Sequence, residues 1–167
     1  LEIEPVRDYP TGSLTANIIG YLGPISASQQ TAYEERGFVT NRDKIGYAGV
    51  ETSMDDILLG KNGLRVIQED VAGEELRNLE PPIPPTPGYN VTLTIDTRLQ
   101  KVAEASLIDE INFWNTRLEA ARRISSGVVI AMNPKTGEIL AMVSYPTYEN
   151  NRLARFIPGY YYNQLAQ

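Results

Sequence analysis

The clearest hydrophobic periodicity in the chain runs from Thr97 to Arg123. Its apolar residues recur every three or four positions and predict one stripe of an amphipathic helix; they are Leu99, Ala103, Leu107, Ile111, Trp114, Leu118 and Ala121. A helix over the whole range would be ~40 Å long, since each residue adds about 1.5 Å. Asp96 is a good N-cap for it, and Arg122 and Arg123 suit the negative end of its dipole.

Strand-like patterns flank this helix. Before it, Val91, Leu93 and Ile95 alternate with threonines, which predicts a half-buried strand. After it, two apolar runs within residues 126–151 surround Asn133-Pro134-Lys135-Thr136-Gly137, where proline and glycine favour a tight turn. We expect a buried hairpin there, then a polar tail in which residues 160–162, all tyrosine, are compatible with the start of another helix.

The first half of the chain lacks long periodic segments. It predicts two short helices and one strand, over Ser28 to Arg36, Val50 to Leu59 and Leu64 to Asp70. Residues 80–88 are rich in proline, which disfavours a helix or central strand and indicates a polyproline spacer. We therefore expect an α+β fold divided into residues 1–88 and residues 89–167.

Composition excludes several kinds of site. The 167 residues include 21 acidic and 15 basic side chains, for a net charge of −6 without a basic block, which argues against a nucleic-acid partner. No cysteine or histidine is present, which excludes catalytic thiols, disulfides, Ser-His mechanisms and zinc sites built on those ligands. No apolar run approaches the ~20 residues of a membrane span, and we predict no metal and no cofactor.

Candidate nucleophiles are equally scarce. Lys135-Thr136-Gly137 matches the K-T-G signature of penicillin-recognising enzymes, but it falls in the predicted turn, so we interpret it as turn chemistry. No serine has a lysine three residues later, and no S-x-N triplet occurs. Without a serine activated by lysine no acyl-enzyme can form, so we predict that this chain is catalytically silent.

Acidic pairs leave a third, weaker possibility. Glu34 with Glu35, or Glu51 with Asp55 or Asp56, could supply the two carboxylates of a glycoside hydrolase. Such residues more often lie on solvated helix faces or match a helix dipole. A hydrolase would require carboxyl groups of raised pKa that face each other in a cleft.

Several segments, in order along the chain, resemble class B penicillin-binding proteins. Arg7 to Gly23 resembles the first motif of that family's pedestal, and Gly46 to Glu51 with Leu59 to Gly63 resembles the second. Thr94 to Gln100 and the hairpin resemble the start of its transpeptidase domain. The matching residues are Arg7, Tyr9, Pro10, Gly12, Gly20, Tyr21, Gly23, Gly46, Gly49, Glu51, Gly60, Gly63, Asp96 and Gln100.

The resemblance implies a glycine-rich pedestal of the dimerisation-domain type with short helices and strands, followed by one long helix and a β-hairpin. Residues 71–75 and the proline-rich run favour the elongation-type branch of the family over the division type. The chain would then be the pedestal and first part of a D,D-transpeptidase, truncated before its nucleophile. The parent enzyme would be acylated by penicillin and act on peptidoglycan in cell-wall synthesis and cell shape.

The family resemblance also implies an extracytoplasmic location, in the periplasm or at the outer face of the inner membrane, with an anchoring helix N-terminal to this chain. Other cell-wall synthesis proteins would bind the pedestal. Asn17 lies where the family often has histidine, so no imidazole role carries over. The alternative is a stand-alone regulatory module of the same machinery without enzymatic activity.

Two structural hypotheses remain. Arg7 and Glu51 are the charged members of the two motif segments, so a bidentate ion pair between them could clamp these segments together. The hairpin edges and the apolar helix stripe would be exposed in a truncated chain, which favours self-association, with a dimer expected.

Overall fold

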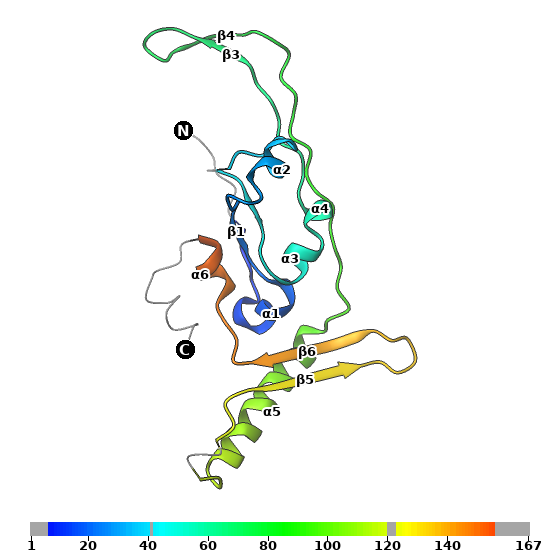
Figure 1. Cartoon of the computed structure of the whole chain (residues 1–167). Coiled ribbons are helices and arrows are strands. Elements are labelled where there is room, and N and C mark those ends of the chain that lie inside the picture. The colour runs from blue at the N-terminus through cyan, green and yellow to red at the C-terminus, as the bar shows by residue number, and fades with distance from the viewer. Residues whose placement is uncertain (1–6, 41, 120–122, 156–167) are drawn as a thin grey trace. The chain divides into compact units, whose positions relative to one another are not determined.

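The computed structural model describes residues 7–40, 42–119 and 123–155. It contains two compact units, one built from residues 1–23, 46–53 and 92–167 and the other from residues 24–45 and 54–91. Within the described residues, the strands form three two-stranded sheets, β1 with β2, β3 with β4 and β5 with β6 (Figure 1). Strands β1 (Leu22–Pro24) and β2 (Lys44–Gly46) are short. The mixture of helices and strands confirms the predicted α+β class.

The first unit contains one long helix against a hairpin (Figure 1). Its elements are η1 (Gly12–Thr15), α1 (Ala16–Ile19), α3 (Gly49–Ser53), α5 (Thr97–Asn115), β5 (Gly127–Met132), β6 (Ile139–Tyr145) and α6 (Asn150–Arg155). The second unit contains α2 (Gln30–Glu34), α4 (Asp55–Leu58), β3 (Ile67–Glu69) and β4 (Glu75–Asn78). None of the described helices is long and apolar enough to cross a membrane.

Helix α5 begins as predicted but ends earlier. The Asp96 side chain accepts hydrogen bonds from the backbone of Arg98 and Leu99, which confirms the N-cap. The helix has 19 residues and ends at Asn115 rather than Arg123. It stops because the Asn115 amide pairs with the backbone of Ile124, at 2.8 Å and 2.7 Å, and turns the chain back toward the hairpin.

The end of the longer predicted helix is only partly described. Leu118 lies beyond the helix, in a turn after Asn115. Ala121 and Arg122 lie outside the described residues, as do the three tyrosines at 160–162.

The β5–β6 hairpin forms as predicted. The strands pair antiparallel from Gly127 opposite Tyr145 to Ala131 opposite Ala141, and a bulge follows. Ala141 and Val143 are buried toward α5, while Val128, Ile130 and Met132 of β5 are exposed. In the turn, Gly137 has φ +78° and donates its N–H to the Asn133 carbonyl, so Lys135 and Thr136 are hairpin-turn residues.

The strand predicted at Val91, Leu93 and Ile95 is absent from the described residues. The segment touches β6 through two hydrogen bonds only, from Thr94 Oγ1 to the Ile139 carbonyl and from Asp96 N–H to the Leu140 carbonyl. These two bonds do not make a strand ladder, and α5 starts directly after Asp96.

The second unit has a small core of Ile25, Phe38 and Ile45, with Tyr33 and Leu59 packed on it. The helix predicted over Val50 to Leu59 is interrupted at Met54, so it appears as α3 and α4. The predicted strand at residues 64–70 is shorter and becomes β3.

The proline-rich run is not a free spacer. It pairs with the preceding segment through isolated antiparallel bridges, Lys61 with Thr86 and Leu64 with Ile83, and these two extended segments lead to the β3–β4 hairpin. Proline tolerates this arrangement because the residues between the prolines, Ile83 and Thr86, supply the N–H donors.

Candidate functional site

The predicted pair between Arg7 and Glu51 forms. Arg7 Nε lies 2.9 Å from Glu51 Oε1, and Arg7 Nη2 lies 3.1 Å from Oε2, a bidentate geometry. Glu51 is only 4% exposed, so this ion pair compensates a buried charge. The Tyr9 hydroxyl donates to the same carboxylate at 3.3 Å and accepts the Leu22 N–H at 3.1 Å. The network joins the first and second motif segments, and a clamping role for it stays a prediction.

Tyr9 serves this network as a neutral hydrogen-bond donor. Burial, and then the negative charge of Glu51, raise the pKa of the Tyr9 hydroxyl above its ordinary value. Arg7 and the Leu22 N–H act in the opposite direction without overcoming these effects. The hydroxyl therefore stays protonated in neutral solution, where it can donate to the carboxylate.

Two glycines allow the motif segments to touch. A Cβ on Gly20 would lie 1.8 Å from the Ala48 carbonyl oxygen, and one on Gly49 would lie 2.3 Å from the Ile18 carbonyl oxygen. Both have positive φ, +85° and +57°. Only glycine fits this reciprocal backbone contact without displacing one segment from the other.

The other predicted residues of this unit surround the same contact. Pro10 occupies a turn closed by the Gly12 N–H and the Tyr9 carbonyl at 2.9 Å. The Tyr21 ring lies 5.9 Å from the rings of both Tyr47 and Tyr148. Gly12, Gly23 and Gly46 face, respectively, the Glu149 side chain, the Tyr47 ring and the Glu51 backbone.

Gly60 and Gly63 belong to the second unit. There they lie against the proline-rich run, facing the Thr86 and Ile83 carbonyls. Their role in the structure is close packing of two extended segments.

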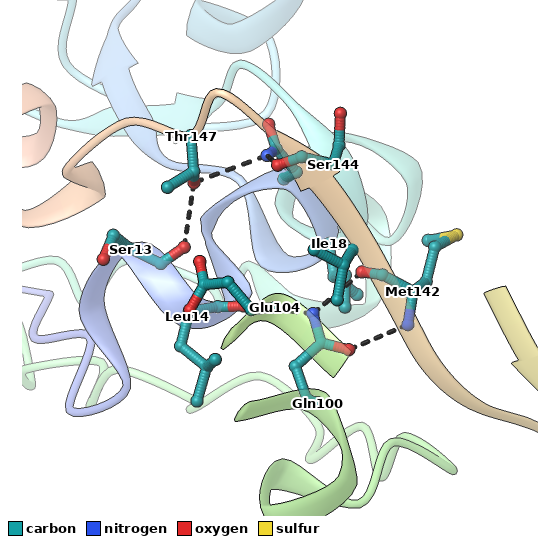
Figure 2. A pocket seen from close by; sticks show the side chains of 10 residues that line it. Ser13, Leu14, Ile18, Gln100, Glu104, Met142, Ser144 and Thr147 are labelled. Carbon is teal, nitrogen blue, oxygen red and sulfur yellow. Dashed lines mark hydrogen bonds between the residues drawn. The ribbon is translucent and has the colours of Figure 1, made fainter. Parts of the chain in front are cut away.

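Gln100 is the most informative of the predicted residues. Its side chain is 2% exposed and points from α5 to the outer edge of β6 (Figure 2). It accepts the Met142 N–H at 2.8 Å, donates to the Met142 carbonyl at 2.8 Å and donates to the Leu14 carbonyl at 3.1 Å. The amide thus pairs with Met142 as a neighbouring strand would, and it also reaches the first motif segment.

A second amide forms the same kind of pairing at the other end of the unit. Asn151 accepts the Tyr9 N–H at 3.0 Å and donates to the Tyr9 carbonyl at 2.9 Å. Asn17 donates to the Ser144 carbonyl at 3.2 Å. Asparagine at position 17 therefore has a structural partner of its own on β6.

Side chains that follow β6 bind carbonyl groups of the first motif segment. Thr147 Oγ1 donates to Ser13 at 2.9 Å, as Figure 2 shows. The Tyr148 hydroxyl donates to Ala16 at 2.8 Å, and Asn150 Nδ2 donates to Gly20 at 3.2 Å. We name this set of contacts, with those of Gln100, Asn17 and Asn151, the junction.

The sequence did not predict the residues after β6 as members of a site. Their only local signal is a run of hydrogen-bonding side chains, Thr147 to Asn151, directly after an apolar strand. Their partners lie more than 120 residues away in the chain, with separations of 132 for Tyr148 and 142 for Asn151.

The junction consists of hydrogen bonds between segments that are far apart in the chain, and it encloses little space. Its small pocket, lined in part by Ser13, Gln100 and Thr147, has a volume of about 10 Å³, which is room for about one water molecule. In the described part of the chain, no group of three acidic side chains could hold a metal ion. Hydrogen bonds from Thr40 and Gln30 lower the pKa of Glu34, the opposite of what a hydrolase acid requires.

Comparison with known proteins matches two family models to this chain, one on each side of the junction. The model of the penicillin-binding protein dimerisation domain matches residues 1–93, and that of the penicillin-binding protein transpeptidase domain matches residues 127–167. The chain belongs to the class B penicillin-binding proteins. Among curated relatives, it is 34% identical to peptidoglycan D,D-transpeptidase MrdA of Acinetobacter baumannii over 90% of this chain and 20% of the relative.

Further relatives agree. MrdA of Escherichia coli K12 is 30% identical over 87% of this chain and 21% of the relative. Among solved structures, penicillin-binding protein 2 (PBP2) in complex with MreC from Helicobacter pylori matches 97% of this chain and 27% of its own, with 25% identity and a TM-score of 0.72. A peptidoglycan synthase complex matches with 30% identity and a TM-score of 0.71, over 95% of this chain and 27% of the other. The chain thus spans about a fifth of the length of its curated relatives.

The junction connects the two matched regions of this penicillin-binding protein. Tyr9 and Leu14 lie in the dimerisation-domain match, whereas Met142 and Asn151 lie in the transpeptidase match. Gln100 lies between the matched ranges and bonds to both sides.

Proposed function

We propose that this chain is the non-catalytic pedestal portion of a peptidoglycan-cross-linking D,D-transpeptidase that acts in bacterial cell-wall synthesis and shape. The relatives named D,D-transpeptidases support the parent activity. The absence of an S-x-x-K motif from the chain, and the turn position of Lys135-Thr136-Gly137, support a silent fragment. Peptidoglycan and penicillin would bind only where the parent chain supplies a nucleophile.

The junction is the observation that carries this proposal. A pedestal must hold the catalytic domain in a fixed orientation, and here the first motif segment is bound to β6 and the following residues by side-chain amides and hydroxyls. Gln100 binds both backbone groups of Met142, and Asn151 binds both backbone groups of Tyr9. Two hydrogen bonds to one residue fix the orientation of its backbone as well as its distance. In this proposal, the pedestal holds the first strands of the transpeptidase sheet in a fixed orientation.

The second unit offers a surface for partners. Residues 64–83, which we name the arm, expose apolar side chains on and beside β3 and β4; these are Leu64, Val66, Val71, Leu76, Leu79 and Ile83. Val71, at the tip, is fully exposed. Exposed apolar side chains gathered on a hairpin are typical of protein-binding surfaces. We infer that other cell-wall synthesis proteins dock there, which the similar solved structures of a PBP2–MreC complex and of a peptidoglycan synthase complex support.

Location and assembly follow from the same proposal. The parent works outside the cytoplasm and is held at the inner membrane by a helix that precedes this sequence. We also propose that the fragment self-associates through the hairpin edges and the apolar stripe of the long helix.

A second function remains open, a stand-alone interaction module of the cell-wall machinery. The exposed arm favours it as much as it favours the pedestal, because either protein would dock partners there. The two differ only in whether a transpeptidase domain continues from the hairpin.

Labelling with a fluorescent penicillin separates these functions. This chain is compared with the native polypeptide that contains it, expressed from its own coding sequence. Labelling of the native polypeptide alone supports the pedestal. If neither is labelled, the regulatory module is favoured, and labelling of this chain would contradict the absence of a nucleophile.

A further inference from the structure

Asn62 is the only asparagine in the sequence that is followed by glycine. In such a pair the backbone nitrogen of the glycine can attack the side-chain amide, because glycine has no side chain to hinder the approach. Packing confines position 63 to glycine, since a Cβ there would lie 2.7 Å from the Ile83 carbonyl oxygen and 2.8 Å from the Pro85 nitrogen. The fit of the second motif segment against the proline-rich run therefore keeps a chemically reactive pair in the chain.

The Gly63 nitrogen is not engaged in the pairing around it. Lys61 and Leu64 donate their N–H groups to the carbonyls of Thr86 and Ile83. The Gly63 N–H has no acceptor among the described residues. No hydrogen bond therefore has to break before this nitrogen loses its proton and acts as a nucleophile.

A cavity of about 360 Å³ adjoins the pair and is lined in part by Lys44, Lys61 and Asn62. It has room for water, which the second step of the reaction consumes. The positive charges of the two lysines favour hydroxide and the negative charge that develops when the amide is attacked.

Two hydrogen bonds hold the Asn62 amide group. Its Nδ2 donates to Asp43 Oδ2 at 2.6 Å and to the Gly37 carbonyl at 3.0 Å. Burial acts to raise the pKa of Asp43, but hydrogen bonds from Arg42, from the Val39 N–H and from Asn62 lower it on balance. The carboxylate is therefore ionised at neutral pH, and a charged acceptor holds Nδ2 more strongly than a neutral one would.

We propose that Asn62 is a site of deamidation and that the Asp43 carboxylate limits its rate. The Gly63 nitrogen forms a bond to Asn62 Cγ, the bond from Cγ to Nδ2 breaks, and Nδ2 leaves as ammonia with the proton that Gly63 gives up. Water then adds to either carbonyl carbon of the resulting succinimide and opens the ring. The product is aspartate or isoaspartate at position 62.

The product cannot restore the native contact. A carboxylate at position 62 has no proton to donate at neutral pH, and it faces the Asp43 carboxylate and the Gly37 carbonyl oxygen. Like charges at this distance repel, so the second motif segment loses its link to these two residues. The modification would destabilise the second unit, a consequence that does not depend on the pedestal role.

The test is mass spectrometry of the native polypeptide that contains this chain, after incubation at neutral and at mildly alkaline pH. Trypsin releases residues 62–65, whose mass distinguishes amide from acid and whose retention in chromatography separates aspartate from isoaspartate. We expect acid to accumulate in proportion to the hydroxide concentration. Conversion should be about tenfold faster than at Asn90, because the β-branched Val91 hinders attack there.

Variants of Asp43 test its part in the reaction. Asp43→Ala removes the charged acceptor and should accelerate conversion about tenfold, whereas Asp43→Asn can still accept a hydrogen bond and should give an intermediate rate. The matched control is Asp56→Ala, since Asp56 is an acidic residue of the same unit that pairs with Arg36 at the surface. It should leave the rate unchanged.

Asn62→Asp reproduces one product directly, and its urea midpoint at neutral pH should lie below that of the wild type. A native polypeptide that stays unmodified at Asn62, under conditions that convert a synthetic peptide of residues 59–66, overturns the proposal. So does equal conversion in wild type and Asp43→Ala, or an acceleration by Asp56→Ala as large as that by Asp43→Ala. An unchanged urea midpoint in Asn62→Asp would overturn the effect on the second unit.

Discussion

Replacing Gln100 by leucine tests the junction most directly. Leucine has a similar volume but no polar group, so the Met142 N–H and the carbonyls of Met142 and Leu14 lose their partner. An unsatisfied buried donor costs about 1–3 kcal/mol, and carbonyls add less because each has two lone pairs. We expect the free energy of unfolding to fall by about 3 kcal/mol, or the Tm by about 6–12 °C.

The assay is urea unfolding followed by the fluorescence of Trp114, the single tryptophan, which lies near the C-terminal end of α5. Gln30→Leu is the matched control, because Gln30 is an exposed helical glutamine of the second unit. It should change the unfolding free energy by less than about 0.5 kcal/mol. If both variants unfold at the same urea concentration, the junction does not contribute as we infer.

Gln100→Glu refines this test through pH. The glutamate can still accept the Met142 N–H, but its carboxylate faces two carbonyl oxygens in a buried site, which raises its pKa in the folded state. A raised folded-state pKa means that stability is present below the ordinary value of about 4.3 and is lost as pH rises through the folded-state value. The variant should therefore be more stable in mild acid than in neutral solution, relative to wild type.

Three further substitutions address the motif segments and the helix start. Arg7→Lys cannot keep a bidentate pair, so the free energy of unfolding measured in urea should fall by about 1 kcal/mol. Arg65→Lys, which changes an exposed pair, should have no measurable effect. Gly20→Ala should abolish folding of the first unit in circular dichroism, whereas Gly73→Ala, with φ +81° and open space around it, should cost only about 1–2 kcal/mol. Hydrogen bonds from Arg98 and from the backbone lower the pKa of Asp96. The wild type should therefore be more stable to unfolding than Asp96→Asn at neutral pH, and this difference should disappear as the pH falls below about 4. If acid lowers the stability of both proteins equally, the cap is contradicted.

Local signals predicted the elements whose stabilising partners are close in sequence. Asp96 caps α5 through the next residues, and Asn133 to Gly137 close the hairpin within one turn. The Arg7–Glu51 contact was also predictable, because Arg7 and Glu51 are oppositely charged members of the two motif segments. In these cases the residue types alone restrict the geometry.

The elements that differ from the prediction depend on partners that are distant in the sequence or follow the element. Helix propensity extends α5 past Asn115, but pairing with Ile124 ends it. Proline content alone indicated a spacer at residues 80–88, whereas the structure pairs this run with residues 61–64. A polar residue such as Gln100 is normally expected at the surface, and its burial depends on the position of β6.

The order in which the chain is made has a consequence for the first unit. Tyr9 is synthesised well before its backbone partner Asn151, which follows 142 positions later. Residues 24–45 and 54–91 hold their own core and can form it while the later segments are still being made. Closing so long a loop costs entropy before any contact compensates for it, which slows folding. The segment around Tyr9 should therefore become protected later than the core of the second unit, and pulse-labelling of the Tyr9 amide during refolding would record that delay.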